Sequence, residues 1–257
     1  MHDLEKETIK AKLQKDPFAL TKSMILEMSN ICNYSNLHPQ CPVSQMKEKR
    51  ILSIDVIEKL LIELKELNYN KVIWPFCYSE PLIDPRFFKV ADMIKKYLPK
   101  ARIAVYSNGF FMDKNLLKEL DELGLLKIVF SVYTPQDYER LSKLNEWKQN
   151  NNLKIIIRLA RRYPMKKRMN DKMCWYDREP VIYDKVCKAP YRYLTINSNG
   201  DVVICCHDYR AMHKFGNIKT ESIKDILLSD RMIDAYVSLI NKERSKFFLC
   251  ERCTKYR

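Results

Sequence analysis

Short apolar runs alternate with amphipathic stretches from residue 22 to residue 159, and this alternation constrains the fold more than any other feature. Runs bounded by turn residues predict strands, and apolar positions spaced three and four apart predict helices. Strands are expected at residues 22–28, 71–76, 102–106, 127–132 and 153–159, and helices at residues 54–67, 86–97, 114–123 and 135–147. Parallel strands joined by crossover helices are the simplest arrangement of this order. The sequence therefore predicts an α/β protein with a barrel-like parallel sheet.

The rest of the chain divides into smaller units. Residues 1–21 are expected to hold an N-terminal helix, residues 22–170 the core, residues 171–186 a connector and residues 187–257 a small C-terminal domain. Within that last unit, residues 193–205 read as a hairpin, because alternating apolar residues flank an Asn-Gly turn. Two short helices are expected at residues 220–228 and 230–241.

The amino-acid composition argues against several classes of protein. The 257 residues include only four glycines, so the chain has no glycine-rich phosphate loop of the dinucleotide or P-loop type. No segment approaches the roughly 18 apolar residues of a membrane span. The N-terminus is polar and of mixed charge, which argues against a signal peptide and predicts a cytoplasmic protein with reduced thiols. The net charge of +14 favours anionic partners.

Nine cysteines in a reducing compartment indicate metal or iron–sulfur ligation. The C-terminal set contains Cys187 before the hairpin, Cys205 and Cys206 at its end, and a Cys250-x-x-Cys253 pair. A hairpin brings its two ends together, so four thiolates can converge on one point. Such a set suits either structural zinc or an iron–sulfur cluster.

A second set lies in the loop after the first strand. It consists of Cys32, His38 and Cys41. Three soft or borderline ligands leave one coordination position open, as a catalytic metal site requires.

Polar groups also follow each later strand of the predicted barrel, where the chemistry of such barrels takes place. The second strand is followed by Ser79-Glu80-Pro81, and the third by Ser107-Asn108-Gly109. Ser131 ends the fourth strand and Arg158 ends the fifth.

Together, these motifs resemble those of the radical S-adenosylmethionine (SAM) enzymes over about residues 22–253. Cys32-Asn33 and Cys41-Pro42 resemble the two ends of that family's cluster loop, and the second-strand and third-strand motifs resemble its G-E-P and T-N-G segments. The C-terminal run with its Asn-Gly-Asp turn and final Cys-x-x-Cys is similar to the SPASM auxiliary-cluster extension in its shortened, twitch form. The resemblance implies a partial (β/α)6 TIM-like barrel followed by a small hairpin and helix domain.

The resemblance also implies roles for residues. The cofactors would be SAM and two [4Fe–4S] clusters, with cluster ligands at Cys32, His38, Cys41, Cys187, Cys205, Cys250 and Cys253. SAM would contact Tyr34, Ser79, Glu80, Ser107, Asn108, Ser131 and Arg158. Arg158 and His207 are the candidate catalytic residues, as a substrate-orienting group and a base.

The first loop departs from the family pattern of three cysteines, because His38 stands where the middle cysteine would fall. Three explanations remain open. His38 is a ligand, since imidazole replaces thiolate in some clusters; or Cys77, just before Ser79, supplies the third thiolate; or the site holds no catalytic cluster.

The expected activity is that of a radical SAM oxidoreductase of dehydrogenase type. It would form a 5′-deoxyadenosyl radical and remove two electrons from a small polar substrate, a sugar or cyclitol with or without a phosphate, through the auxiliary cluster. An electron donor such as flavodoxin or ferredoxin is the expected partner. The alternatives are a peptide-modifying or RNA-modifying radical enzyme, or a non-catalytic iron–sulfur protein. The basic run at residues 158–168 contains one aromatic residue, Tyr163, which argues against nucleic acid.

Overall fold

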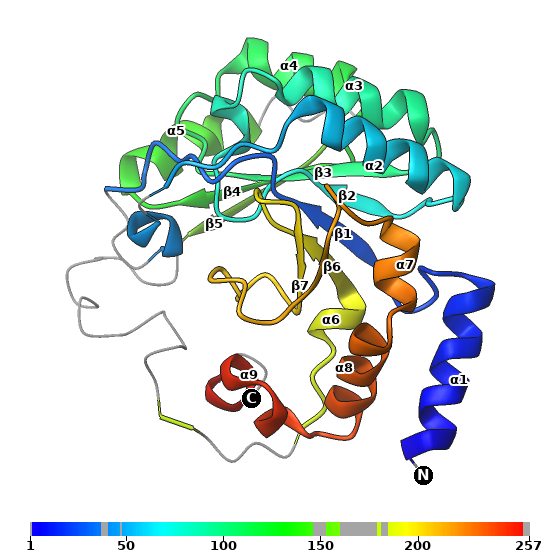
Figure 1. The fold of residues 1–257 in the computed structure, drawn as a ribbon. Coiled ribbons are helices and arrows are strands. Elements are labelled where there is room, and N and C mark those ends of the chain that lie inside the picture. Colours follow the sequence, from blue (N-terminus) through cyan, green and yellow to red (C-terminus); the bar gives the residue numbers. More distant parts are fainter. Residues whose placement is uncertain are drawn as a thin grey trace.

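A computed structural model describes residues 2–36, 41–46, 48–145, 153–159, 179–180 and 185–253. Eight strands form one sheet in the order β5-β4-β3-β2-β1-β6-β7-β8 (Figure 1). The strands are β1 (Ser23–Leu26), β2 (Val72–Trp74), β3 (Arg102–Ser107), β4 (Lys127–Val132), β5 (Lys154–Leu159), β6 (Tyr193–Ile196), β7 (Asp201–Val203) and β8 (Lys214–Asn217). All neighbours from β5 to β6 pair in parallel, and β7 and β8 pair antiparallel. The expected α/β fold is confirmed.

Four helices cover one face of the parallel strands (Figure 1). They are α2 (Ile54–Glu66), α3 (Phe87–Tyr97), α4 (Lys114–Glu122) and α5 (Pro135–Asn145). Ser53 and Asp113 cap α2 and α4 by accepting hydrogen bonds from backbone N–H groups of the first turn. Gly124 ends the α4 turn at a positive φ of 71°, as its position predicts.

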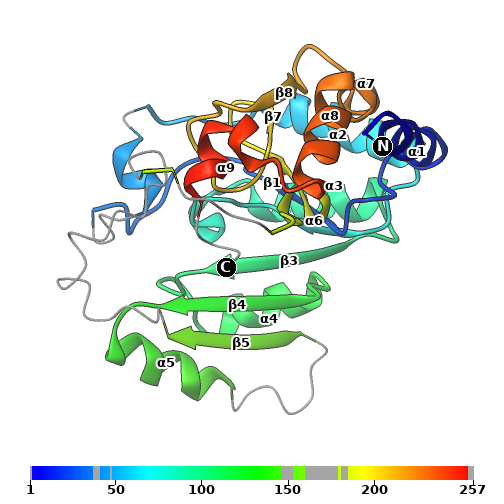
Figure 2. The same ribbon diagram turned by 90° about the horizontal axis from the view of Figure 1, so that it is seen from below.

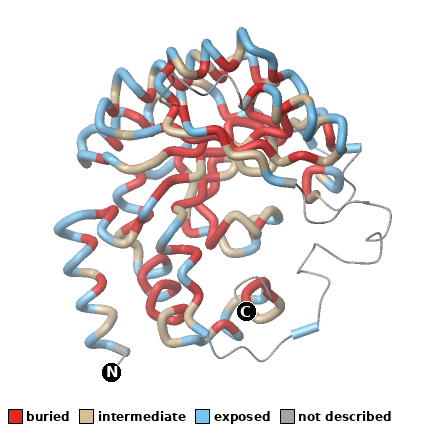
Figure 3. The backbone as a smooth tube through the Cα atoms, turned by 180° about the vertical axis from the view of Figure 1, so that it is seen from behind, coloured by how far each residue is buried: buried red, intermediate tan, exposed pale blue. Residues whose placement is uncertain are grey.

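The core lies between these helices and the sheet (Figure 3). Alternate residues of β3 and β4, such as Ile103, Val105, Ile128 and Phe130, are at most 3% exposed. The helices meet them with buried apolar residues at their own periodic positions, such as Leu60 of α2 and Val90 of α3. Because successive side chains of a strand point to opposite faces, the residues between them face the other side, where no helix of the α2–α5 layer lies.

The C-terminal hairpin forms as expected but does not stand apart from the barrel strands. Its first strand, β6, lies parallel to β1 with Ser23 opposite Tyr193, so β6 is the sixth parallel strand of the sheet. The pairing of β6 with β1 was not predicted from the sequence, and the expected boundary of the C-terminal unit at residue 187 stays a prediction. Within the described residues, the end strands β5 and β8 have no pairing with each other, so the barrel is partial.

The remaining helices lie on the β6–β8 side of the sheet (Figure 1). They are α1 (His2–Lys15), α6 (Ala189–Arg192), α7 (Ile223–Leu228), α8 (Asp230–Ile240) and α9 (Phe248–Arg252). Helix α1 packs on the outside of α7 and α8 (Figure 2). The Lys6 ammonium lies 2.7 Å from the carboxylate of Asp234 and 3.4 Å from that of Asp230. No helix in the described part of the chain has the length and apolar character needed to span a bilayer.

Candidate functional site

A cavity of about 240 Å³ opens at the carboxyl ends of the first four strands. Eight of the residues predicted from the sequence line it: Cys32, Tyr34, Cys41, Ser79, Glu80, Ser107, Asn108 and Ser131. These residues come from the carboxyl ends of four strands and the loops that follow them, which meet because parallel strands end at one edge of the sheet. His38 lies outside the described residues.

The Glu80 carboxylate connects two of these loops. It is 3% exposed, and its oxygens accept hydrogen bonds from the backbone N–H of Asn108 at 2.6 Å and of Leu82 at 3.2 Å. The Asn108 amide in turn donates to the side chain of Asn33 in the loop after β1, at 2.8 Å. Burial raises the pKa of Glu80, and the hydrogen bonds from Asn108 and Ser107 oppose that shift. The motifs after β1, β2 and β3 therefore form one connected frame.

The backbone conformation at position 109 requires glycine. Its φ is 73°, and a Cβ there would lie 2.7 Å from the side chain of Leu141. Only glycine adopts this conformation without a clash, so the third residue of the Ser107-Asn108-Gly109 motif has a structural role.

The thiols of Cys32 and Cys41 suit a metal or cluster. Burial raises the pKa of Cys32, and burial raises that of Cys41 to about 11. Both thiols are therefore protonated at neutral pH, and a bound cation would stabilise their thiolates. Two thiolate donors beside a polar cavity fit an iron–sulfur cluster, and the cavity leaves space for a small molecule bound next to that cluster.

Cys77, the alternative third ligand, lies between the two cysteine sites. It lines the same cavity as Cys32 and Cys41. Its thiol, however, is directed at the carbonyl oxygen of Cys206, with a sulfur–oxygen distance of 3.9 Å. After burial and Glu27, Cys206 and Cys205 contribute more than Cys41 to raising its pKa. These contacts therefore associate Cys77 with the auxiliary cysteines more closely than with Cys32 and Cys41.

Glu27 is a buried carboxylate beside the site that the sequence motifs do not indicate. It follows β1, is 3% exposed, and accepts hydrogen bonds from the N–H of Tyr78 at 3.0 Å and of Ser198 at 2.9 Å. The Tyr78 hydroxyl also donates to the Cys206 carbonyl. Glu27 thus joins the barrel edge to the hairpin. The sequence does contain an indication of this role, since Glu27 is the one carboxylate at the end of an otherwise apolar strand. A carboxylate in such a position is expected to be buried, and a buried charge requires hydrogen-bond partners.

The four predicted auxiliary ligands come together. Cys187, Cys205, Cys250 and Cys253 are each 7–9% exposed. Burial raises the pKa of Cys205, and the thiols of Cys206, Cys250 and Cys187 add to that shift. Burial also raises the pKa of Cys250, with contributions from Cys187 and Cys253. Neighbouring buried thiols that destabilise one another's charged forms are the expected state of a cluster site before metal binding.

Within the described ranges, no three His, Cys, Asp or Glu side chains lie close enough to hold a single metal ion. The fit of the auxiliary site to a cluster therefore rests on its four thiol donors. A four-iron cluster binds each cysteine through a different iron, so its cysteine ligands lie farther apart than the ligands of a single metal ion.

The two candidate catalytic residues lie in different places. Arg158 is exposed at the end of β5, and its guanidinium donates to the Tyr106 hydroxyl at 3.1 Å. Tyr106 lines the cavity, so Arg158 lies at its edge. His207 follows the auxiliary cysteines, and its backbone N–H donates to the Cys205 sulfur. His207 is not part of the cavity lining, and its assignment as a base stays a prediction.

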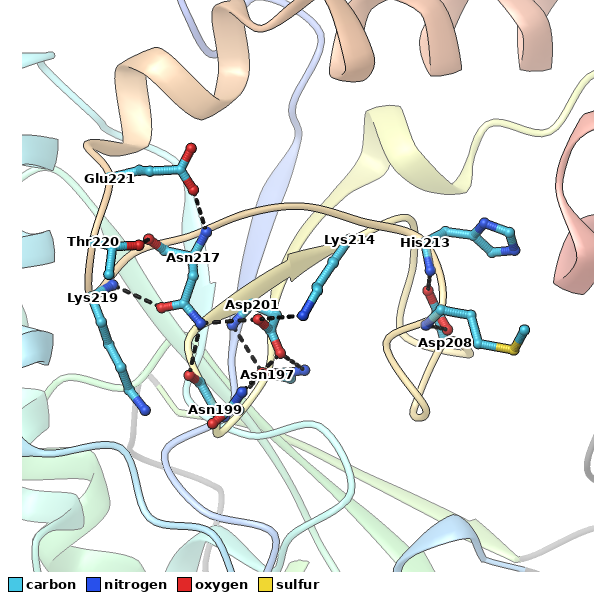
Figure 4. Close-up of polar contacts among 11 residues, drawn as sticks. Asn197, Asn199, Asp201, Asp208, His213, Lys214, Asn217, Lys219, Thr220 and Glu221 are labelled. Atoms are coloured by element: carbon cyan, nitrogen blue, oxygen red, sulfur yellow. Dashed lines mark hydrogen bonds and ion pairs between the residues drawn. The ribbon is translucent and has the colours of Figure 1, made fainter.

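A polar network centred on Asp201 fixes the turn of the hairpin between β6 and β7 (Figure 4). The Asp201 carboxylate is 4% exposed and accepts from the side-chain amides of Asn199 at 3.0 Å and Asn217 at 2.9 Å, and from that of Asn197 at 3.4 Å. The Lys214 ammonium lies 3.9 Å away. Burial raises the pKa of Asp201, but these four side chains lower it more, so it lies below its ordinary value of 3.8.

Replacing Asp201 with Asn is therefore expected to lower the free energy of unfolding by about 1–3 kcal/mol at pH 7. The folded chain binds the Asp201 proton less tightly than the unfolded chain does. The stabilisation is thus present above pH 3.8 and is lost as the pH falls below that value. Denaturant unfolding at several pH values measures it, with Asp92→Asn on the exposed face of α3 as the control. A constant difference between wild type and D201N down to the lowest pH would contradict this reading.

Comparisons with known proteins agree with this geometry. The family model described as the radical SAM superfamily matches residues 26–174, and the model of the SPASM iron–sulfur cluster-binding domain matches residues 187–254. The S-adenosyl-L-methionine-dependent 2-deoxy-scyllo-inosamine dehydrogenase of Niallia circulans is 24% identical over 241 residues, which cover 90% of this chain and 92% of the relative.

Two solved structures share the fold. BtrN in complex with AdoMet and 2-DOIA superposes with a TM-score of 0.73 at 22% identity, over 92% of this chain and 94% of that chain. The anSMEcpe protein with bound AdoMet and the Cp18Cys peptide gives a TM-score of 0.58 at 16% identity, over 91% and 89%. Since the superfamily model spans more than half of the residues and the cavity joins the family's motifs, the chain belongs to the radical SAM superfamily.

Proposed function

We propose that this enzyme oxidises an alcohol of a small polar substrate, a sugar or cyclitol, by two electrons. Membership of the family brings a [4Fe–4S] cluster and SAM, and the SPASM match brings an auxiliary iron–sulfur cluster. When bound, the first cluster and SAM supply one electron and a 5′-deoxyadenosyl radical that removes a hydrogen atom. The observation that carries the proposal is the auxiliary set of four buried thiols close to the cavity.

Four protein ligands fill every iron position of a four-iron cluster, so the auxiliary site is proposed to take an electron rather than bind substrate. Two residues of the loop after β2 connect the cavity to the auxiliary site. Cys77 and Tyr78 line the cavity and also contact the carbonyl of Cys206, next to the proposed ligand Cys205. Removal of one hydrogen atom, one electron and one proton from a secondary alcohol leaves a ketone.

The cavity residues are proposed to bind SAM and exclude water. Polar groups that line the cavity come from Tyr34, Ser79, Glu80, Ser107, Asn108 and Ser131. The relative from Niallia circulans is a dehydrogenase by name, which supports the same reaction class. The charge of +14 supports an acidic electron donor such as flavodoxin or ferredoxin.

The test is product analysis under anaerobic conditions. The reconstituted enzyme is incubated with SAM, a reductant and a panel of sugars, cyclitols and their phosphates. The proposal expects 5′-deoxyadenosine together with a substrate product that has lost two hydrogens by mass. Parallel incubations contain peptides or RNA, and an oxidised peptide or RNA product with no product from the sugar and cyclitol panel would overturn the substrate class.

His38 is proposed as the third ligand of the first cluster, because Cys77 is directed at Cys206. His38→Ala is expected to lower the iron content from about eight to about four per chain, while Cys77→Ala keeps about eight. Iron and sulfide counts after anaerobic reconstitution measure both variants. Loss of four irons in Cys77→Ala alone would move the third ligand to Cys77.

A further inference from the structure

An aromatic wall continues from the cavity into the interior of the half-barrel. It consists of Trp74, Phe76 and Tyr106, whose ring centroids lie 5.3–6.1 Å apart. Phe76 and Tyr106 line the cavity that also contains Cys32 and Ser131. Trp74 packs behind them on β2. The wall therefore begins beside the proposed SAM site and lies on the face of the sheet opposite the α2–α5 layer.

Two cations lie on this wall. The Arg158 guanidinium lies 5.6 Å from the centre of the Tyr106 ring, and the Lys127 ammonium lies 4.8 Å from that of Trp74. Lys127 and Arg158 come from neighbouring strands, β4 and β5. Their positions share one face of the sheet, because Ser131 pairs with Arg158 and lies four residues after Lys127.

A third cation lies in register with the second. Lys154 of β5 is directly opposite Lys127 of β4. Like charges at opposite positions of neighbouring strands destabilise a sheet. Within the described residues, no carboxylate forms an ion pair with Lys127, Lys154 or Arg158. Among the residues that the structure describes, this face of β4 and β5 therefore presents positive charge with no acid paired to it.

The wall also contains a buried donor that lacks an acceptor. Trp74 is 9% exposed, and its Nε1–H has no hydrogen-bond partner among the described residues. Buried donors are normally paired. The wall therefore presents hydrogen-bond donors and positive charge, from the indole N–H, two lysines and an arginine. A ligand with anionic oxygen atoms would match both properties.

We propose that Trp74, Phe76, Tyr106, Lys127 and Arg158 form the substrate subsite, and that the substrate carries a phosphate or carboxylate beside a ring that packs on the aromatic wall. This inference rests on the proposed function and narrows its substrate class. It separates this chain from the dehydrogenase of Niallia circulans, whose named substrate is an amine. An ammonium group would be repelled by the cations of this wall.

Titration calorimetry on the reconstituted enzyme with SAM tests the proposal. Four probes share a six-membered ring: myo-inositol 1-phosphate, glucuronate, myo-inositol and scyllo-inosamine. The phosphate or the carboxylate probe is expected to bind at least about tenfold more tightly than the neutral one, and the amine most weakly. The tighter of the two anionic probes identifies the anionic group.

Substitutions in the aromatic wall test whether the anionic probe binds there. Arg158→Gln and Lys127→Gln are each expected to weaken the anionic probe by about tenfold or more, and Arg158→Lys by less. Lys118→Gln removes an exposed charge on α4 and is the matched control, with no change expected. Equal or tighter binding of the amine would overturn the inference, as would no saturable binding of either anionic probe up to about 10 mM.

The same experiment distinguishes a wrong substrate subsite from a wrong enzyme activity. 5′-Deoxyadenosine formation by the same wild-type preparation reports on the proposed function. If it forms while the amine is preferred, the radical chemistry stands and the anionic subsite is wrong. If it does not form, the proposed function itself is contradicted, whatever the probes show.

Discussion

Replacing Cys32 and Cys41 together with alanine is expected to abolish 5′-deoxyadenosine formation and to lower the iron content from about eight to about four per chain. Both thiols line the cavity at the end of β1, where Tyr34 N–H donates to the Cys32 sulfur at 3.4 Å. Burial raises the pKa of both thiols, so they lose their protons at neutral pH only when a cation binds. Without these two thiolates, a single imidazole cannot retain four irons.

The loss is expected to be local. Cys32 and Cys41 lie in the loop after β1, outside the apolar core between the sheet and helices α2–α5. The double variant should therefore keep its far-ultraviolet circular dichroism and its remaining four irons. Cys77→Ala is the matched control, since it removes a thiol from the same cavity. Retention of about eight irons by the double variant would refute the ligand assignment.

Replacing Cys250 and Cys253 together with alanine is expected to have the second large effect. The variant should lose the other four irons and all substrate oxidation, and should still form 5′-deoxyadenosine. The reason is that both thiols belong to the auxiliary set with Cys187 and Cys205, while the SAM cavity contains none of these four. Iron counts and product analysis on the same preparation separate the two losses.

The same variant is expected to loosen the C-terminus. Helix α9 has only five residues, too few to be stable alone. Free energy from ligation of a cluster becomes folding free energy of the segment that supplies the ligands. Limited proteolysis should therefore cut the double variant near α9 faster than wild type. Cys206→Ala is the control, because its side chain is not a proposed ligand and its backbone carbonyl still accepts from Tyr78. If Cys206→Ala also loses four irons, the choice of Cys205 over Cys206 is wrong.

The core of the fold was predictable because its signals are local. The apolar periodicity of α2 and the buried run of β4 appear within single windows of the sequence, and both elements lie within a residue of their predicted bounds. The position of β6 beside β1 was not predictable, since it depends on pairing between residues 170 positions apart, such as Ser23 and Tyr193. β8 is four residues long and polar at both ends, so it has no periodic signal.

The candidate site shows the same division. Glu80, Asn108 and Ser131 could be placed together because strand ends of a parallel sheet meet at one edge. The wall of Trp74 and Lys127 could not, because it depends on the register between strands that are some fifty residues apart. The side of the cavity to which Cys77 belongs likewise follows from tertiary contacts with Cys206.

The central claim is that this chain cleaves SAM although its first loop has two cysteines and a histidine. The most direct measurement is 5′-deoxyadenosine formation by the anaerobically reconstituted wild type with SAM and a reductant, beside the two double variants. The account predicts formation by wild type and by C250A/C253A, and none by C32A/C41A. A wild-type preparation that holds about eight irons and forms no 5′-deoxyadenosine would contradict it.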